Sequence, residues 1–363
     1  MSNSPSRSDL PPTVVFVAGF LGSGKTRLLL RAASLLSNSG TPVAFITNDQ
    51  GDDLVDTEWA AERGGEVTGV PGGCFCCRFS DFVEAADRML ARQPRVIFAE
   101  PVGSCTDLAA TVLRPLQSSY GFELRVAPLT VLIDPARASE IHTAAPDVAY
   151  LFQKQIEEAD IVCLSKADLY DAGPELPGIS VRRRLSAKTG EGVAAWLDEV
   201  LGGTLPVASR TLMIDYERYA RAEAALGWLN ARVLVNLEQP LSPAVLAGPL
   251  VDGLEETLTT AGARIAHLKI FDGASTGSVK IAVCRNGEEP DVEGDLAASP
   301  ASRHDLVLNL RAEAGPELLR EVVEAAFARL PPKIEIVSLQ AFQPLPPKPQ
   351  HRMVGASLFL KGR

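Results

Sequence analysis

The sequence predicts an α/β chain of two domains: a three-layer domain with a central sheet, then a smaller ferredoxin-like α+β domain. Three observations predict it. A glycine-rich loop lies between a strand-like and a helix-like run near the N-terminus, apolar strands and helices alternate after it, and the pattern changes beyond residue 203. We expect a disordered leader at 1–12, the first domain at 13–203, the second at 204–343 and a proline-rich tail at 344–363.

Composition excludes several classes of protein. The 363 residues are 46% hydrophobic and 22% charged, which is ordinary for a globular chain of about two domains. The formal net charge of −10 argues against a general nucleic-acid or membrane-surface binder, although Arg182-Arg183-Arg184 is a small basic patch. No apolar run reaches the length of a membrane span. Six cysteines, three of them clustered, do not suggest a disulfide framework, so a reducing cytoplasm is expected.

The loop at 19–26, Gly-Phe-Leu-Gly-Ser-Gly-Lys-Thr, matches the phosphate-loop pattern G-x-x-x-x-G-K-[ST] at every required position. A β-branched strand at 14–18 precedes it, and a Leu- and Ala-rich helix at 27–36 follows, which an ordinary glycine turn would not require. The first domain is therefore predicted to be a P-loop NTPase. Lys25 would reach the β- and γ-phosphates and the Thr26 hydroxyl would ligate Mg²⁺. Backbone N–H groups would hold the phosphates at Gly19, Gly22, Ser23 and Gly24.

Two acidic residues lie at the carboxyl ends of predicted strands. Asp49 lies in the polar loop after the strand at 42–47, and Glu100 is the last residue of the strand at 95–100. Since open α/β sheets bind ligands at the carboxyl ends of their strands, both are predicted to act with Lys25 in catalysis. Glu100 would contact Mg²⁺ directly or through water, and Asp49 would join the Mg²⁺ shell or position water. A solvated acidic loop is the alternative for Asp49.

Three thiols crowd into the segment Gly72-Gly73-Cys74-Phe75-Cys76-Cys77. Thiolates are soft ligands suited to zinc and to Cu(I), and the glycines free the backbone to aim them at one point. The segment predicts a metal site at Cys74, Cys76 and Cys77 with a fourth position left open. A buried cysteine cluster or a redox pair is the alternative. Cys105 either supplies a fourth sulfur or is simply a small buried side chain.

Two short motifs, the first at 165–168 and the second at 186–188, favour a guanine base as the ligand. An Asp at position 168 can accept hydrogen bonds from guanine N1 and N2, while the Lys166 stem lies along the base. A backbone N–H in the second motif can meet guanine O6. After a phosphate loop, these motifs favour GTP over ATP, with a solvated loop as the alternative. The motifs are Ser165-Lys166-Ala167-Asp168 and Ser186-Ala187-Lys188.

Beyond a linker at 202–210, the predicted element order is βαββαβ, which suggests a ferredoxin-like domain. The acidic stretch 286–302 is expected to be a loop between strands. Prolines cannot continue a sheet, so Pro344–Pro349 is expected to be extended.

The motifs now in hand resemble the CobW-like GTPases, relatives of the nickel-inserting GTPases of urease and hydrogenase maturation. The resemblance rests on the phosphate loop followed by Gly73-Cys74-Phe75-Cys76-Cys77, and on Glu100 and Ser165-Lys166-Ala167-Asp168. It implies a GTPase whose cysteines hold Zn²⁺ or a related metal such as Co²⁺, with hydrolysis gating delivery to a client. Some relatives are linked to cobalamin synthesis.

Three positions depart from the family pattern. The family usually has Asn where this chain has Ser165, Asn-Glu where it has Asn48-Asp49, and a Thr-x-Gly-like run where Pro101-Val102-Gly103-Ser104 follows Glu100. The strictness for GTP over ATP stays open for this reason. The four histidines are scattered, so bulk metal storage is not expected.

The sequence therefore predicts a cytoplasmic GTP-hydrolysing metallochaperone that uses GTP, Mg²⁺ and Zn²⁺ (or Co²⁺) and serves a client metalloprotein. Two alternatives stay open. One is an accessory GTPase that activates or loads a corrinoid-dependent protein, and the other is a regulatory GTP switch with structural or redox cysteines. Neither nucleic acid nor membrane is expected as a partner, and a homodimer is left open.

Overall fold

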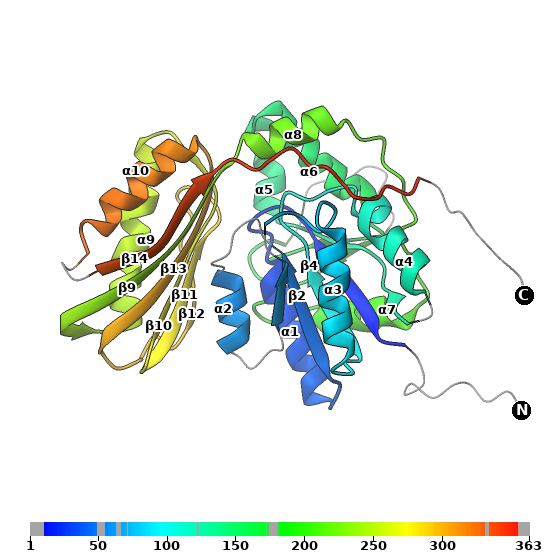
Figure 1. Cartoon of the computed structure of the whole chain (residues 1–363), viewed down its shortest axis with the longest axis horizontal. Coiled ribbons are helices and arrows are strands. Elements are labelled where there is room, and N and C mark those ends of the chain that lie inside the picture. The colour runs from blue at the N-terminus through cyan, green and yellow to red at the C-terminus, as the bar shows by residue number, and fades with distance from the viewer. Residues whose placement is uncertain are drawn as a thin grey trace, which may run out of the picture. The chain divides into compact units, whose positions relative to one another are not determined.

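Two compact units make up the chain (Figure 1). The computed structural model describes residues 11–48, 55–62, 67–70, 72–121, 123–171, 173, 181–330 and 334–354. The first unit comprises Met1–Asp49, Gly65–Tyr216 and Pro347–Arg363, and the second comprises Gln50–Gly64 and Glu217–Pro346. This division differs from the boundaries expected from the sequence. It falls after Tyr216 rather than at residue 203, it assigns 50–64 to the second unit, and it returns the C-terminal segment to the first.

The first unit is built on a parallel sheet of the strand order β3-β2-β4-β1-β6-β7-β8, with β5 beside β1. Every described pairing in it is parallel, and β1 is buried along its whole length, as expected for a sheet covered on both faces. The strands are β1 (Thr13–Ala18), β2 (Val43–Asn48), β3 (Val67–Val70), β4 (Val96–Glu100), β5 (Arg125–Val126), β6 (Thr130–Ile133), β7 (Ile161–Leu164) and β8 (Arg182–Arg184).

Helices cover both faces of this sheet. Successive side chains of β1 point to opposite faces, so they show which helices lie on each. Val15 and Val17 pack in one apolar cluster with side chains of α1 and α7. The Phe16 ring points the other way, 6.3 Å from the ring of Phe75 and 5.6 Å from that of Phe82 in α3. The helices are α1 (Lys25–Asn38), α3 (Phe79–Leu90), η2 (Ala109–Leu113), α4 (Arg114–Tyr120), α5 (Pro135–Glu140), η3 (Ile141–Thr143), α6 (Pro146–Glu158), α7 (Val193–Gly202) and, at the unit boundary, α8 (Tyr216–Ala224).

The second unit is an antiparallel sheet in the order β12-β11-β10-β13-β9-β14, with two helices on one face. Without the edge strands β11 and β12, the order β10-β13-β9-β14 is that of two split βαβ units, so the ferredoxin-like prediction is confirmed. The elements are β9 (Gly227–Leu241), α9 (Pro243–Thr260), β10 (Arg264–Ala274), β11 (Gly277–Val283), β12 (Asp291–Gly294), β13 (Ala301–Glu313), α10 (Pro316–Phe327) and β14 (Ile334–Phe342).

Strand β12 corrects the expectation of a loop at 286–302. Its four residues alternate between partly buried and exposed, and the single apolar one, Val292, is exposed, so the apolar signal for a strand is weak. Backbone pairing with β11 holds it in place, and an edge strand needs no more.

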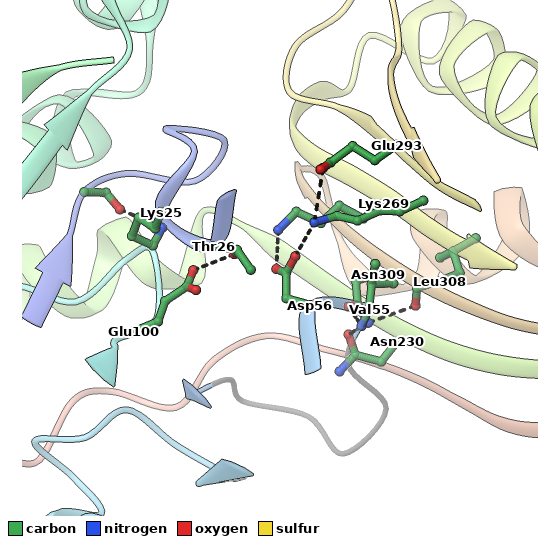
Figure 2. Close-up of polar contacts among 12 residues, drawn as sticks. Lys25, Thr26, Val55, Asp56, Glu100, Asn230, Lys269, Glu293, Leu308 and Asn309 are labelled. Carbon is green, nitrogen blue, oxygen red and sulfur yellow. Dashed lines mark hydrogen bonds and ion pairs between the residues drawn. The ribbon is translucent and has the colours of Figure 1, made fainter. Parts of the chain in front are cut away.

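A short helix, α2 (Val55–Glu62), belongs to the second unit although it lies in the chain between β2 and β3. Figure 2 shows its first turn against the sheet. The Asp56 carboxylate lies 2.5 Å from the Lys269 ammonium and 2.8 Å from that of Lys280, and the Val55 N–H donates to Asn309 Oδ1 at 2.9 Å. A helix of eight residues is marginal by itself, so these contacts with the sheet decide that it forms. The sequence analysis did not anticipate it for that reason.

No helix in the described part of the chain has both the length and the apolar character needed to cross a bilayer.

The ion-pair cluster at Asp56 leads to a test of stability. Burial raises the pKa of Asp56, but the attraction of Lys269 and Lys280 outweighs it, so the pKa lies well below its usual value. The carboxylate therefore stabilises the fold above the unfolded-state pKa of about 4, and the contribution is lost as the pH falls through the lower folded-state pKa. We expect Asp56→Ala to cost about 3 kcal/mol at pH 7, because it leaves the buried ammonium of Lys280 and the partly buried ammonium of Lys269 without their shared partner.

Urea unfolding followed by tryptophan fluorescence measures this loss, since Trp59 and Trp228 both lie in the second unit. Glu324→Ala is the control, because its pair with Arg320 is exposed and should contribute less than about 0.5 kcal/mol. Equal losses for the two variants would show that Asp56 is not a structural anchor.

Candidate nucleotide and metal site

The phosphate loop has the backbone that its glycines predict. Gly19 has φ +134°, and a Cβ there would lie 2.3 Å from the backbone oxygen of Leu132, so only glycine fits. Gly24 has φ +91° and is the N-cap residue of α1, which begins at Lys25. The buried Ser23 hydroxyl has no hydrogen-bond partner among the described residues, as expected of a group that faces a ligand.

Lys25 and Thr26 lie at the start of α1, where anions bind favourably. The Lys25 ammonium donates to the loop carbonyls of Gly19 at 3.0 Å and Phe20 at 3.4 Å. The Thr26 hydroxyl donates to Glu100 Oε1 at 3.0 Å, because β1 and β4 are neighbours and end at the same edge (Figure 2). A hydroxyl and a carboxylate at this spacing are oxygen ligands of the type that Mg²⁺ prefers. Asp49 lies outside the described residues.

The two guanine motifs meet at the ends of β7 and β8. The Ser186 hydroxyl donates to Asp168 Oδ1 at 2.5 Å, and the same hydroxyl accepts from the Thr189 N–H at 3.1 Å. Lys166 takes a positive φ of 55° and pairs with Asp134 at 2.8 Å. The Asp168 side chain is exposed at this edge, so it is accessible to a base. The other members of the motifs are Ser165, whose hydroxyl donates to a backbone carbonyl, half-buried Ala187 and exposed Lys188.

The three cysteines of the thiol segment form one cluster. Cys74 Sγ lies 2.9 Å from Cys76 Sγ and 3.1 Å from Cys77 Sγ, and the sulfurs of Cys76 and Cys77 are 3.8 Å apart. Cys74 and Cys76 are buried, whereas Cys77 is only half-buried. All three sulfurs lie within 4.8 Å of one another, a spacing that a single zinc ion can bridge with small adjustments.

The acidities within the cluster are unequal. Hydrogen bonding by the Cys105 thiol, and then by Cys76 and Cys77, holds the pKa of Cys74 well below its usual value. The pKa values of Cys76 and Cys77 are raised, and the largest cause for each is its hydrogen bond with Cys74. The pKa of Cys76 lies well above its usual value, and that of Cys77 is about 11. Cys74 is therefore the thiol of the three that ionises most readily, and a metal that binds all three sulfurs must displace the protons that the thiols still carry.

Cys105 lies beside Cys74 but outside the group of three sulfurs. Of its two sequence interpretations, complete burial agrees with the small buried side chain. Its hydrogen bond with Cys74 also brings it beside the cluster, as the fourth-sulfur interpretation required, although its sulfur is not one of the three that lie within 4.8 Å of one another.

Asn48, the last residue of β2, holds the thiol segment in place. Its Nδ2 donates to the carbonyls of Val70 at 2.8 Å and Gly73 at 2.7 Å, and its Oδ1 accepts from the Phe75 N–H at 2.9 Å. From the sequence, a role was expected for its neighbour Asp49 but not for Asn48 itself. Two signals were available: Asn48 follows a predicted strand, and it matches the Asn of the Asn-Glu pair in the family pattern.

Replacement of Asn48 tests this positioning role. Asn48→Ala removes three hydrogen bonds, so the thiols of the metal-free protein should react with a disulfide reagent at least about tenfold faster. Asn48→Asp should behave similarly, because a carboxylate keeps the acceptor for Phe75 but turns an oxygen toward two carbonyls. The measurement is the rate of thiol modification under native conditions, and Ser39→Ala is the exposed control. Unchanged rates would contradict the role.

Comparison with known proteins identifies part of the chain. Residues 13–186 match the family model of the CobW/HypB/UreG nucleotide-binding domain. Zinc chaperone CobW of a Sinorhizobium species is 27% identical over 218 residues, 51% of this chain and 57% of that protein. The zinc-regulated GTPase metalloprotein activator 1 of Schizosaccharomyces pombe is 28% identical over 171 residues, 44% of this chain and 40% of that protein.

Zinc chaperone YjiA of Escherichia coli is 29% identical over 165 residues, 44% of this chain and 50% of that protein. The chain spans about half the length of the curated relatives it matches.

Proposed function

We propose that this chain, a CobW-like protein through its CobW/HypB/UreG nucleotide-binding domain at 13–186, is a GTP-hydrolysing metallochaperone. It would bind zinc at Cys74, Cys76 and Cys77 and release it to a client metalloprotein. The single observation that carries the proposal is that one residue, Asn48, anchors the thiol segment from the same strand end that leads into the nucleotide edge of the sheet.

In this proposal each residue of the nucleotide site has a separate task. The backbone of the loop at 19–24 binds the phosphates, and Lys25 offsets the negative charge that develops during transfer. Thr26 and Glu100 hold Mg²⁺, which when bound neutralises charge on the phosphate oxygens. Asp168, positioned by Ser186, accepts hydrogen bonds from the guanine base, and Asp49 positions the attacking water.

Two contacts support a coupling between nucleotide and metal. The thiol segment is bonded to Asn48, which precedes Asp49, and Cys74 is hydrogen-bonded to Cys105, which lies in the loop after Glu100. A nucleotide-dependent movement of Asn48 or of the loop after Glu100 would therefore reach the sulfurs directly. If the metal binds the GTP and GDP states with different affinity, hydrolysis drives its release.

The names of the relatives support zinc as the first metal to test. Two of the three are zinc chaperones, and the third is a zinc-regulated GTPase and metalloprotein activator. The thiolate donor set also accepts Co²⁺, so cobalt belongs in the same experiment.

Zinc affinity in the two nucleotide states is the decisive measurement. We expect tight binding to the reduced protein, with affinities that differ tenfold or more, about 1.4 kcal/mol, between GDP and a non-hydrolysable GTP analogue. Competition with a chromophoric chelator measures it. The triple replacement of Cys74, Cys76 and Cys77 by Ser should abolish tight binding, while Cys284→Ser, in the second unit, should leave it unchanged.

Equal affinity in both states would remove the gating. A regulatory GTP switch, or an accessory GTPase for a corrinoid-dependent protein, would then account for the chain better.

The phosphate loop has its own test. Lys25→Ala should lower the rate of GTP hydrolysis by about a hundredfold or more, because a charge-stabilising donor is lost from the transition state. Zinc binding without nucleotide should be unaffected, which separates a chemical effect from unfolding. Phosphate release at saturating GTP is the measurement, and normal turnover would refute the assignment.

A further inference from the structure

The C-terminal segment 347–353, here called the strap, returns to the first unit and runs along the thiol segment (red in Figure 1). The Lys348 N–H donates to Cys77 Sγ at 3.1 Å. The Gln350 N–H donates to the Cys76 carbonyl at 2.9 Å, and the Met353 N–H donates to the Ala110 carbonyl at 2.8 Å. Three backbone N–H groups of the strap are therefore bound to the first unit.

The sequence of the strap leaves one backbone N–H, that of Lys348, to donate to the Cys77 sulfur. Pro346, Pro347 and Pro349 have no N–H, so Lys348 carries the sole backbone donor in that run. Pro349 also restricts Lys348 to an extended conformation, and neighbouring prolines favour the same state. The neighbouring prolines thus restrict the backbone conformation of Lys348, and with it the orientation of the N–H that donates to Cys77.

Two side chains of the strap contact the first turn of α3. The Gln350 amide accepts from the Ser80 N–H at 2.8 Å, in the first turn of α3, and its Nε2 contacts the Ser80 hydroxyl at 3.2 Å. The His351 ring meets the Phe79 ring edge-on, with centroids 5.2 Å apart. These contacts fix the register of the strap beside the thiols.

Arg352 makes the strongest anchor. Its Nε donates to Asp107 Oδ2 at 2.7 Å, and its Nη2 donates to the Leu212 carbonyl at 2.9 Å. The Asp107 side chain is 1% exposed, so its carboxylate needs a cationic partner, and Arg352 supplies it. Asp107 follows Cys105 by two residues, which connects this anchor to the loop after Glu100.

We propose that the strap fills a groove for an extended peptide, and that a client displaces it with an extended segment carrying an arginine in the place of Arg352. Backbone hydrogen bonds accept any extended chain, so they give the groove affinity. The buried carboxylate of Asp107 gives it specificity. The strap touches Cys77, the most accessible of the three thiols, so its displacement uncovers the sulfur at which metal exchange begins. The inference rests on the proposed function.

A matched pair of variants at position 348 tests the contact with the sulfur. Lys348→Pro removes the N–H, and Lys348→Ala keeps it. In the zinc-loaded full chain with GDP, Lys348→Pro should release zinc to a chelator about fivefold faster than wild type, as expected for one lost hydrogen bond. Lys348→Ala should match wild type. Equal rates for the two variants would overturn the contact.

Arg352 and a peptide test the groove. Arg352→Ala should release zinc about tenfold faster, Arg352→Lys should be intermediate, and Arg320→Ala in α10 should have no effect. A synthetic peptide of residues 346–353, added to Arg352→Ala, should slow release toward the wild-type rate. The same peptide with alanine for arginine should not. Failure of the peptide to act at millimolar concentration would overturn the groove.

The outcomes separate the two proposals. Tight zinc binding with identical release from all variants would refute the strap and leave the metallochaperone intact. Absence of tight zinc binding in the wild type would refute the metallochaperone. The strap is then judged on the metal-free protein, where alkylation of Cys77, mapped by mass spectrometry, should be faster for Lys348→Pro than for Lys348→Ala, and equal alkylation would refute it.

Discussion

The side-chain amide of Asn48 is the contact on which the arrangement of the site depends. It satisfies three backbone groups of the segment that runs from β3 into the thiols, and these bonds replace the strand pairing that ends there. Other hydrogen bonds of the segment lie further along, at the turn from Cys74 to Arg78 and at the strap. An amide offers two donors and an acceptor, and the only other amide side chain, that of Gln, is one methylene longer.

The thiol cluster is connected to two strand ends of the parallel sheet. One connection is the side chain of Asn48, the last residue of β2. The other is the loop from Glu100 to Cys105 and Asp107, which contacts Cys74 through Cys105 and the strap through Asp107. With Zn–S bonds of about 2.3 Å, a tetrahedral zinc needs sulfurs about 3.8 Å apart. The distances of 2.9 Å from Cys74 to Cys76 and 3.1 Å from Cys74 to Cys77 must therefore lengthen by several tenths of an ångström when metal binds, which a small displacement of the loop can supply.

The chain crosses between its two units more often than a simple tandem arrangement requires. The connection from β2 to β3 contributes α2 to the second unit, and the segment after β14 returns to the first. Both excursions end in buried or partly buried ion pairs, Asp56 with Lys269 and Lys280, and Asp107 with Arg352. Charged anchors of this kind are weak as sources of stability but strict about partner and geometry, which suits segments that must dock in one register.

The sequence by itself determined the phosphate loop, the parallel and ferredoxin-like layers and the cysteine cluster, because each is encoded locally. The loop needs glycines with positive φ at fixed spacing, the layers follow from the period of apolar residues, and three cysteines within four residues cannot lie far apart. Only the tertiary structure decided the role of Asn48, the proximity of Cys105 to Cys74, the placement of α2 and the strap. The contacts that place α2 and the strap join residues that are far apart in the sequence. Asp56 and Lys269 are 213 residues apart, and Cys77 and Lys348 are 271 apart, so no local pattern indicates the pairing.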